Sequence, residues 1–224
     1  MPKSNSRHRN GHSDGTQPFN LILLGDPAAG KATQAQSLIK KYGFYNLDMG
    51  KELRSSARLR KIGRFSETAA LGIASPTDLV KDIFKKRIGG APRSKGILFN
   101  GTPKLIGEAK LVARLLKENK RACVLFLYIA LPLSETIKRT SLRKKKDKRS
   151  DDDMDAMRRR IDGYYRTDIY PKIIPYFASR YPYKKVSGMG TELQVWKRID
   201  GEVELFLRKY EITESTKVTK KVRK

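Results

Sequence analysis

The chain has 224 residues, of which 38% are apolar and 32% charged, and its formal net charge is +26. This length suffices for one domain with a full core. Its composition excludes a membrane span, because no apolar run approaches roughly 18 residues. The polar start before Phe19 predicts no signal peptide, and the single cysteine, Cys123, excludes a disulfide within the chain. We therefore expect a cytoplasmic protein.

The positive charge belongs mainly to the body of the chain. Residues 1–18 carry a net charge of +2 and residues 211–224 a net charge of +3, so residues 19–210 hold +21. We expect a disordered basic arm at 1–18 and a basic tail at 211–224, disordered from Ile212. The charge of the body favours a polyanionic partner. A general adaptation to a cell interior rich in salt or polyanions is an alternative explanation.

Short apolar runs, typical of strands buried on both faces, alternate with helical patterns along the chain. The sequence predicts five strands, at Asn20–Leu24, Phe44–Leu47, Ile97–Phe99, Val124–Ile129 and Tyr183–Val186. It predicts helices from about Lys31 to Tyr42, from an N-cap at Ser75, from Leu105 to Leu116, from near Ser134, and from Leu193 to Tyr210. This alternation predicts an α/β fold with a parallel sheet covered on both faces.

A phosphate-binding loop is predicted directly between the first strand and the first helix. The sequence GDPAAGKAT, residues 25–33, follows the pattern G-x-x-x-x-G-K, with the hydroxyl residue one position later than usual, at Thr33. Backbone N–H groups of such a loop, and of the helix N-terminus behind it, face phosphates. Lys31 adds a positive charge for the β- and γ-phosphates. The motif therefore predicts an ATP-binding site.

This loop resembles that of the adenylate kinase family, which reads G-x-P-G-x-G-K-G-T-Q. The positions that match are Pro27, Gly30, Lys31, Thr33 and Gln34. Two family glycines are replaced, by Ala28 and Ala32, and a positive φ at either alanine would cost about 1–2 kcal/mol. The resemblance covers about residues 19–210.

The resemblance implies a P-loop NTPase fold of three layers with a five-stranded parallel sheet. It also implies a small helical acceptor-binding insert at about 50–77 and a short lid at about 140–150. The family's S-T-G-D-x-x-R motif appears as DMGKELR, residues 48–54. Arg54 would hold the α-phosphate of the acceptor nucleotide, and Met49 replaces the threonine that contacts the acceptor.

The family's D-G-F-P-R motif appears as NGTPK, residues 100–104. Asn100 replaces the aspartate that orders water around magnesium. Lys104 replaces the arginine that grips the acceptor phosphate, and it supplies charge without the bidentate fork. Four residues later, Glu108 replaces the glutamine that reads the adenine edge. It keeps an acceptor for the adenine amino group but lacks the amide donor.

The lid motifs are also similar to those of the family. Arg139 and Arg143 match the pair that begins the lid, with Arg139 stacking on the donor base and Arg143 touching phosphate. The family's R-x-D-D with a further arginine is matched by Arg149, Asp151, Asp152 and Arg160. The two arginines would clamp the transferring phosphoryl group, and the two aspartates would help close the lid. The short interval between Arg143 and Arg149 leaves no room for a structural zinc.

The resemblance thus implies three sets of site residues. The catalytic set is Lys31, Arg143, Arg149 and Arg160. The ATP-binding set is Gly25, Ala28, Ala29, Gly30, Lys31, Ala32, Thr33, Arg139 and Met189. The acceptor-binding set is Met49, Arg54, Gly101, Lys104, Glu108, Arg149 and Arg160. Mg²⁺ bound with ATP would be held partly by Thr33, with an indirect contribution from Asn100.

The resemblance implies an ATP:AMP phosphotransferase of nucleotide biosynthesis that forms two ADP. We expect a monomer, because the fold completes itself and no exposed coiled-coil pattern is visible. Two alternatives stay open: a kinase of the same fold for UMP or CMP, and a catalytically weak relative that binds nucleotide or RNA. Met49, Lys104 and Glu108 support the first alternative, and Asn100 with the net charge supports the second. A weak RNA contact is compatible with catalysis and would be salt-sensitive, because phosphate contacts release counterions. No membrane partner is expected.

Overall fold

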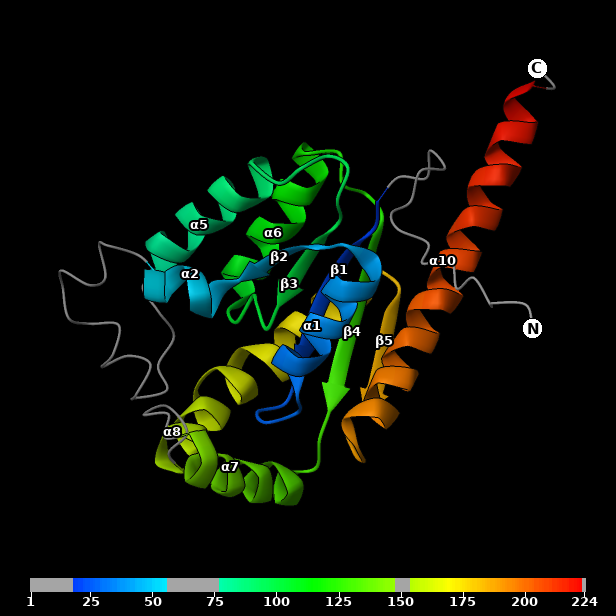
Figure 1. The fold of residues 1–224 in the computed structure, drawn as a ribbon. Coiled ribbons are helices and arrows are strands. Elements are labelled where there is room, and N and C mark those ends of the chain that lie inside the picture. Colours follow the sequence, from blue (N-terminus) through cyan, green and yellow to red (C-terminus); the bar gives the residue numbers. More distant parts are fainter. Residues whose placement is uncertain (1–17, 56–76, 148–153, 223–224) are drawn as a thin grey trace, which may run out of the picture.

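The structure is a computed structural model that describes residues 18–55, 77–147 and 154–222. Its centre is a sheet of five parallel strands in the order β2-β3-β1-β4-β5. Helices cover both faces of this sheet (Figure 1). The predicted α/β fold is confirmed. The arm at 1–17, most of the predicted acceptor-binding insert and the predicted lid residues 148–150 lie outside the described residues.

The five strands match the five apolar runs of the sequence. They are Asn20–Gly25 (β1), Tyr45–Asp48 (β2), Ile97–Asn100 (β3), Val124–Ala130 (β4) and Tyr183–Ser187 (β5). Every strand begins and ends within one residue of its predicted bounds. For β1, β3 and β4 the reason is that strands buried on both faces read as continuous apolar runs. The edge strands β2 and β5 are partly exposed and mix polar with apolar residues.

Helices fill the intervals between the strands. Before β4 they are Lys31–Tyr42 (α1), Met49–Ser55 (α2), Thr77–Gly89 (α5) and Ile106–Glu118 (α6). After β4 they are Leu133–Asp147 (α7), Met154–Arg160 (α8), the π-helix Ile161–Ile173 (η1), Ile174–Ala178 (α9) and Glu192–Val222 (α10). Within the described part of the chain, no helix has the length and apolar composition needed to cross a membrane.

Glycines set both ends of α1. Gly30 precedes the helix with φ +82°, and Gly43 follows it with φ +68°. The N–H of Gly43 donates to the carbonyl of Ile39 at 2.9 Å, which closes the last turn. Left-handed residues at these positions are most easily glycine, because glycine has no Cβ to clash. The predicted span from Lys31 to Tyr42 is confirmed at both ends.

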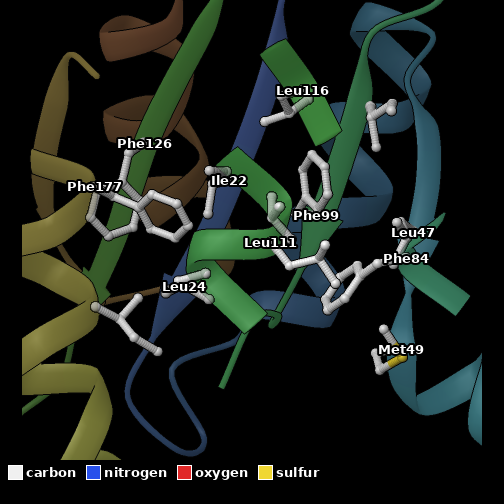
Figure 2. Packing of buried hydrophobic residues seen from close by; sticks show 14 of the residues in the cluster. Ile22, Leu24, Leu47, Met49, Phe84, Phe99, Leu111, Leu116, Phe126 and Phe177 are labelled. Carbon is white, nitrogen blue, oxygen red and sulfur yellow. The ribbon is translucent and has the colours of Figure 1, made fainter. Parts of the chain in front are cut away.

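Alternate residues of the central strand serve two separate cores. Ile22 and Leu24 face a cluster covered by α5, α6, η1 and α9, whereas Leu21 and Leu23 face a cluster covered by α1 and α10. Figure 2 shows the first cluster, in which Ile22 and Leu24 pack near aromatic residues of neighbouring strands and helices. The period of two that strands impose therefore fixes β1, and the loop that follows it, between two packed layers.

Two features of the helices differ from expectation. The helix α10 continues to Val222, so the prediction of disorder from Ile212 is wrong as far as that residue. No glycine or proline follows Gly201, and nothing in the sequence therefore stops the helix. The π-helix η1, which contains Pro171, was not anticipated. A π-helix is rare, and the sequence pattern holds no specific signal for it.

Candidate active site

The candidate site lies at the carboxyl end of β1, where the strand order reverses. From β1 the chain passes through α1 to β2 at one edge, and it later passes from β3 through α6 to β4 on the other side of β1. Ligands of open α/β sheets bind at such a point. Figure 1 shows the loop after β1 at the same end of the sheet as α7 and α8. The predicted phosphate loop therefore occupies the ligand-binding position of the fold.

Two residues of this loop adopt left-handed backbone conformations. Gly30 has φ +82° and Ala28 has φ +57°. The N–H of Ala29 donates to the carbonyl of Asp26 at 3.2 Å, which tightens the turn between them. Ala32, by contrast, lies in the first turn of α1 and needs no special conformation. Of the two alanines that replace family glycines, only Ala28 therefore carries strain.

The side chain of Lys31 folds back over the loop. Its Nζ donates to the carbonyls of Gly25 at 2.8 Å and Asp26 at 2.7 Å. A Cβ added at Gly101, in the turn after β3, would lie 3.7 Å from Cε of Lys31. The ammonium group is thus held between the ends of two neighbouring strands. Phosphate oxygens are acceptors of the same kind and stronger, because they carry charge.

Two further cations lie near Tyr164 and Tyr165, adjacent tyrosines of η1. The hydroxyl of Tyr165, on η1, donates to the same carbonyl of Gly25 at 2.9 Å. The adjacent ring of Tyr164 has its centroid 5.1 Å from that of Tyr165, and Nζ of Lys104 lies 5.1 Å from the Tyr164 ring. Burial raises the pKa of the Tyr165 hydroxyl, and the charge of Arg160 opposes that rise. The loop that Lys31 contacts is therefore connected through Tyr165 and Tyr164 to Lys104, and Arg160 is close enough for its charge to act on the Tyr165 hydroxyl.

The sequence that builds this site is similar to that of known proteins. A family model for adenylate kinase matches residues 23–181. The chain belongs to the adenylate kinase family. It is therefore an enzyme, a nucleotide-binding phosphotransferase of the kinase class, as the sequence predicted.

Individual adenylate kinases match nearly the whole described body. The enzyme of Thermus thermophilus is 32% identical over 181 residues, which cover 80% of this chain and 94% of that relative. The enzyme of Parabacteroides distasonis is 29% identical over 183 residues, which cover 81% of this chain and 95% of that relative. The enzyme of Porphyromonas gingivalis is 29% identical over 194 residues, which cover 84% of this chain and 97% of that relative. The similarity therefore spans the fold as well as the loop.

The side chain of Glu108 is not open to a nucleotide base in this structure. It is 3% exposed, and its Oε2 accepts from the backbone N–H groups of Lys104 at 2.9 Å and Leu105 at 3.3 Å. Burial raises the pKa of Glu108, and these two hydrogen bonds act against that rise. Part of the carboxylate thus caps the N-terminus of α6 in this adenylate kinase relative, which the sequence did not indicate.

Met49 lies in the hydrophobic core. It is 5% exposed, and Figure 2 shows it below Leu47 and Phe84. The helix that Met49 begins is also tied to α5, because Glu52 and Arg87 form an ion pair of 3.3 Å. The methionine therefore fixes α2 by packing, and its expected contact with the acceptor stays a prediction.

The residues expected around the donor base belong to α7 and to the connection between β5 and α10. Nε of Arg139 pairs with Glu135 on the same helix at 2.8 Å, and this hydrogen bond lowers the pKa of Glu135. Met189 is 41% exposed, and its carbonyl accepts from Nη1 of Arg198 at 2.6 Å. Arg139, expected to stack on the donor base, and Met189, expected to bind ATP, thus lie on two separate elements.

The residues expected near magnesium offer neutral oxygens. Thr33 lies partly exposed in the first turn of α1, and Asn100 ends β3, paired in register with Leu23 of β1. Magnesium takes oxygen ligands and retains several waters, so two neutral side chains fit an ion that is held mainly by phosphates. Among the described residues, no cluster of three His, Cys, Asp or Glu side chains forms a separate metal site.

For several predicted site residues, the side chain or the whole residue lies outside the described part of the structure. The backbone of Arg54 belongs to α2 and that of Arg143 to α7, but neither side chain is among those described. The remaining residues of this kind are Arg149, Asp151 and Asp152. The helix expected near Ser134 is confirmed as α7, so Arg139 and Arg143 are on one helix, one turn apart.

One feature of the site was missed in the sequence. Asp26, in the phosphate loop, is 7% exposed, and its carboxylate accepts from the hydroxyls of Tyr128 and Tyr170 and from the N–H of Leu131. Burial raises the pKa of both tyrosines. The only available signal was a carboxylate placed directly after an apolar strand, and its partners are more than a hundred residues away.

Proposed function

We propose that this chain transfers the terminal phosphate of Mg-ATP to AMP, giving two ADP. The observation that carries the proposal is the phosphate loop at the switch point, with Lys31 folded over it and with Lys104 and Arg160 near the tyrosines of η1, one of which contacts the loop. These cations come from the loop, from the segment after β3, and from the residue before η1. Cations from separate segments that meet at one phosphate-binding loop suit phosphoryl transfer between two nucleotides.

The chemistry asks mainly for position and positive charge. A phosphoryl group in flight spreads negative charge over its oxygens, and fixed cations stabilise that charge. We expect Lys31 to exchange its two carbonyl partners, Gly25 and Asp26, for phosphate oxygens of ATP. No general base is needed, because the acceptor phosphate oxygen is already ionised. Arg160 and Lys104 would then face the transferring group and the acceptor phosphate.

Magnesium would bind with the donor phosphates, next to the hydroxyl of Thr33. Thr33 would help to hold it there, and the ion would supply positive charge for the transferring phosphoryl group. We expect Arg54, Arg143 and Arg149 to add further charge, and Asp151 and Asp152 to help close the site, as in the family motifs that these residues match.

CMP is a second candidate acceptor, because Glu108 stands where the family has the glutamine that reads the adenine edge. Its carboxylate is buried and already accepts two backbone hydrogen bonds at the start of α6. A carboxylate accepts from an exocyclic amino group, which adenine and cytosine both carry, but it donates nothing to a ring nitrogen. We place AMP first, because the relatives that match are named adenylate kinases.

The test is ADP formation from Mg-ATP with AMP, CMP, UMP or GMP as acceptor. The proposal predicts the highest kcat/KM with AMP. A preference for CMP or UMP would keep the reaction class and overturn the assignment of the acceptor. No turnover with any acceptor, despite ATP binding, would overturn the enzyme proposal. RNA affinity measured across a salt series would then test the binding alternative.

A further inference from the structure

A buried carboxylate in the phosphate loop joins three segments that are distant in sequence. Oδ1 of Asp26 accepts from the hydroxyl of Tyr128 at 2.6 Å and also from the hydroxyl of Tyr170. Oδ2 accepts from the N–H of Leu131 at 2.7 Å. Tyr128 belongs to β4, Leu131 to the connection between β4 and α7, and Tyr170 to η1. A side chain beside the catalytic lysine therefore links the loop to the sheet and to a helix.

The space around these bonds is not filled by close packing. A cavity of about 180 Å³ separates the loop, the start of α7 and η1, and its lining includes Asp26, Leu131, Ile161, Arg166 and Tyr170. Segments that are separated by a cavity lack the dispersion contacts that would hold them in register. The hydrogen bond from Tyr170 to Asp26 therefore joins η1 to the loop beside this cavity, together with the ring contact between Tyr170 and Tyr128.

The helix η1 is fixed to the phosphate loop at two points. Besides the bond from Tyr170 to Asp26, the hydroxyl of Tyr165 donates to the carbonyl of Gly25 at 2.9 Å. Arg160 immediately precedes η1, and its charge acts on the Tyr165 hydroxyl. A shift of η1 relative to the loop would therefore move Arg160 relative to phosphates that bind at the loop.

We propose that Asp26 is a positioning residue, which holds η1, and with it Arg160, in register with the phosphate loop. The inference rests on the proposed function, because it assigns Arg160 to the transferring phosphoryl group. Asp26 itself faces Tyr128, Tyr170 and Leu131 with its carboxylate, and it acts through them. Phosphoryl transfer depends steeply on such register, since its catalysis is largely positioning.

The Tyr170→Phe variant removes the bond to η1 and leaves the two other donors on Asp26. We expect kcat to fall about tenfold while KM for Mg-ATP changes less than about twofold, because the loop and Lys31 are untouched. The matched control is Tyr42→Phe. The hydroxyl of Tyr42 also donates to a carboxylate, that of Asp200, at 2.7 Å, but between α1 and α10. We expect Tyr42→Phe to keep the wild-type kcat.

A double-mutant cycle tests whether Tyr170 acts through Asp26. In the Asp26→Ala background, the Tyr170→Phe change should lower kcat no further. The proposal is overturned if Tyr170→Phe alone lowers kcat no more than Tyr42→Phe does. It is also overturned if the effects of Asp26→Ala and Tyr170→Phe multiply. Should Asp26→Ala fail to fold, the comparison of the two tyrosine variants decides alone.

Hydrogen exchange separates this proposal from the proposed function. If the wild-type chain transfers phosphate to no nucleoside monophosphate, the proposed function fails, and exchange at the backbone N–H groups of η1 decides the positioning. Faster exchange in Tyr170→Phe than in Tyr42→Phe would support the tie between loop and helix. Equal exchange in the two variants would overturn it.

Discussion

Ala28 occupies a backbone conformation that glycine adopts without strain. Its φ of +57° lies in the left-handed region, where a Cβ costs about 1–2 kcal/mol. Glycine also loses more backbone entropy on folding, by roughly 0.5–1 kcal/mol. We therefore expect Ala28→Gly to raise the free energy of unfolding by up to about 1 kcal/mol, measured by urea denaturation.

The neighbouring alanine is the control for this change. Ala29 is 2% exposed and is not among the residues with positive φ. Ala29→Gly should therefore lower the free energy of unfolding by about 1 kcal/mol. Equal effects of the two substitutions would contradict the argument from strain.

Glu108 is a buried acid whose charged form is disfavoured. Because burial raises its pKa above the ordinary value of 4.5, the folded state binds the proton more tightly than the unfolded state. Its contribution to stability is therefore present at low pH and is lost as the pH rises through the folded-state pKa. Glu108→Gln keeps an oxygen for the N–H groups of Lys104 and Leu105 and does not titrate. The stability of this variant relative to wild type should increase between pH 4 and pH 8.

Urea unfolding at a series of pH values measures that difference. A difference in the free energy of unfolding between Glu108→Gln and wild type that stays constant over this range would show that the buried carboxylate titrates as it does in the unfolded chain. A stability of Glu108→Gln relative to wild type that falls as the pH rises would give Glu108 a lowered pKa, and would mean that its hydrogen bonds outweigh its burial.

At the scale of the elements, Asn20 holds the amino ends of three strands together. Its Nδ2 donates to the carbonyl of Cys123 at 3.0 Å, and its Oδ1 accepts from the N–H of Ile97 at 3.0 Å. The side chain is fully buried at the end of β1 opposite the phosphate loop. Asn20→Ala should cost about 1–3 kcal/mol of stability, because buried groups lose their partners.

The same substitution should leave kcat unchanged at a temperature where the variant is folded. Thermal unfolding and the ADP assay, run on the same sample, check both statements. A loss of kcat without a loss of stability would mean that the two ends of the sheet are coupled, which this account does not predict.

The elements show where sequence reasoning succeeds. Strand bounds were predicted to within one residue. For the three central strands the reason is that burial on both faces gives a continuous apolar run. The phosphate loop was predicted because glycines and a lysine at fixed spacing have few other uses. Both signals are local, and each is carried by fewer than ten neighbouring residues.

The features that were missed depend on contacts between distant parts of the chain. Asp26 meets Tyr170 only after the sheet and η1 have formed, and nothing near Asp26 in the sequence marks that partner. The capping role of Glu108 was hidden by its place in a family motif. The continuation of α10 to Val222 was missed because a basic composition was taken to indicate disorder.

At the scale of the whole molecule, the net charge of +26 should oppose folding by self-repulsion. Salt screens charges that are separated by more than about 10 Å at 0.1 M. We therefore expect Tm to rise when sodium chloride increases from about 20 to about 200 mM, as measured by scanning calorimetry. A Tm that is independent of salt would show that acidic and basic side chains are interspersed closely enough to cancel.

The central claim is that the loop around Lys31 carries out phosphoryl transfer, and one comparison tests it most directly. The rate of ADP formation from Mg-ATP and AMP is measured for Lys31→Ala and for Lys40→Ala, an exposed lysine on the same helix. The account predicts a loss of at least about a hundredfold in kcat for Lys31→Ala and wild-type kcat for Lys40→Ala. Equal activity of the two variants would contradict it.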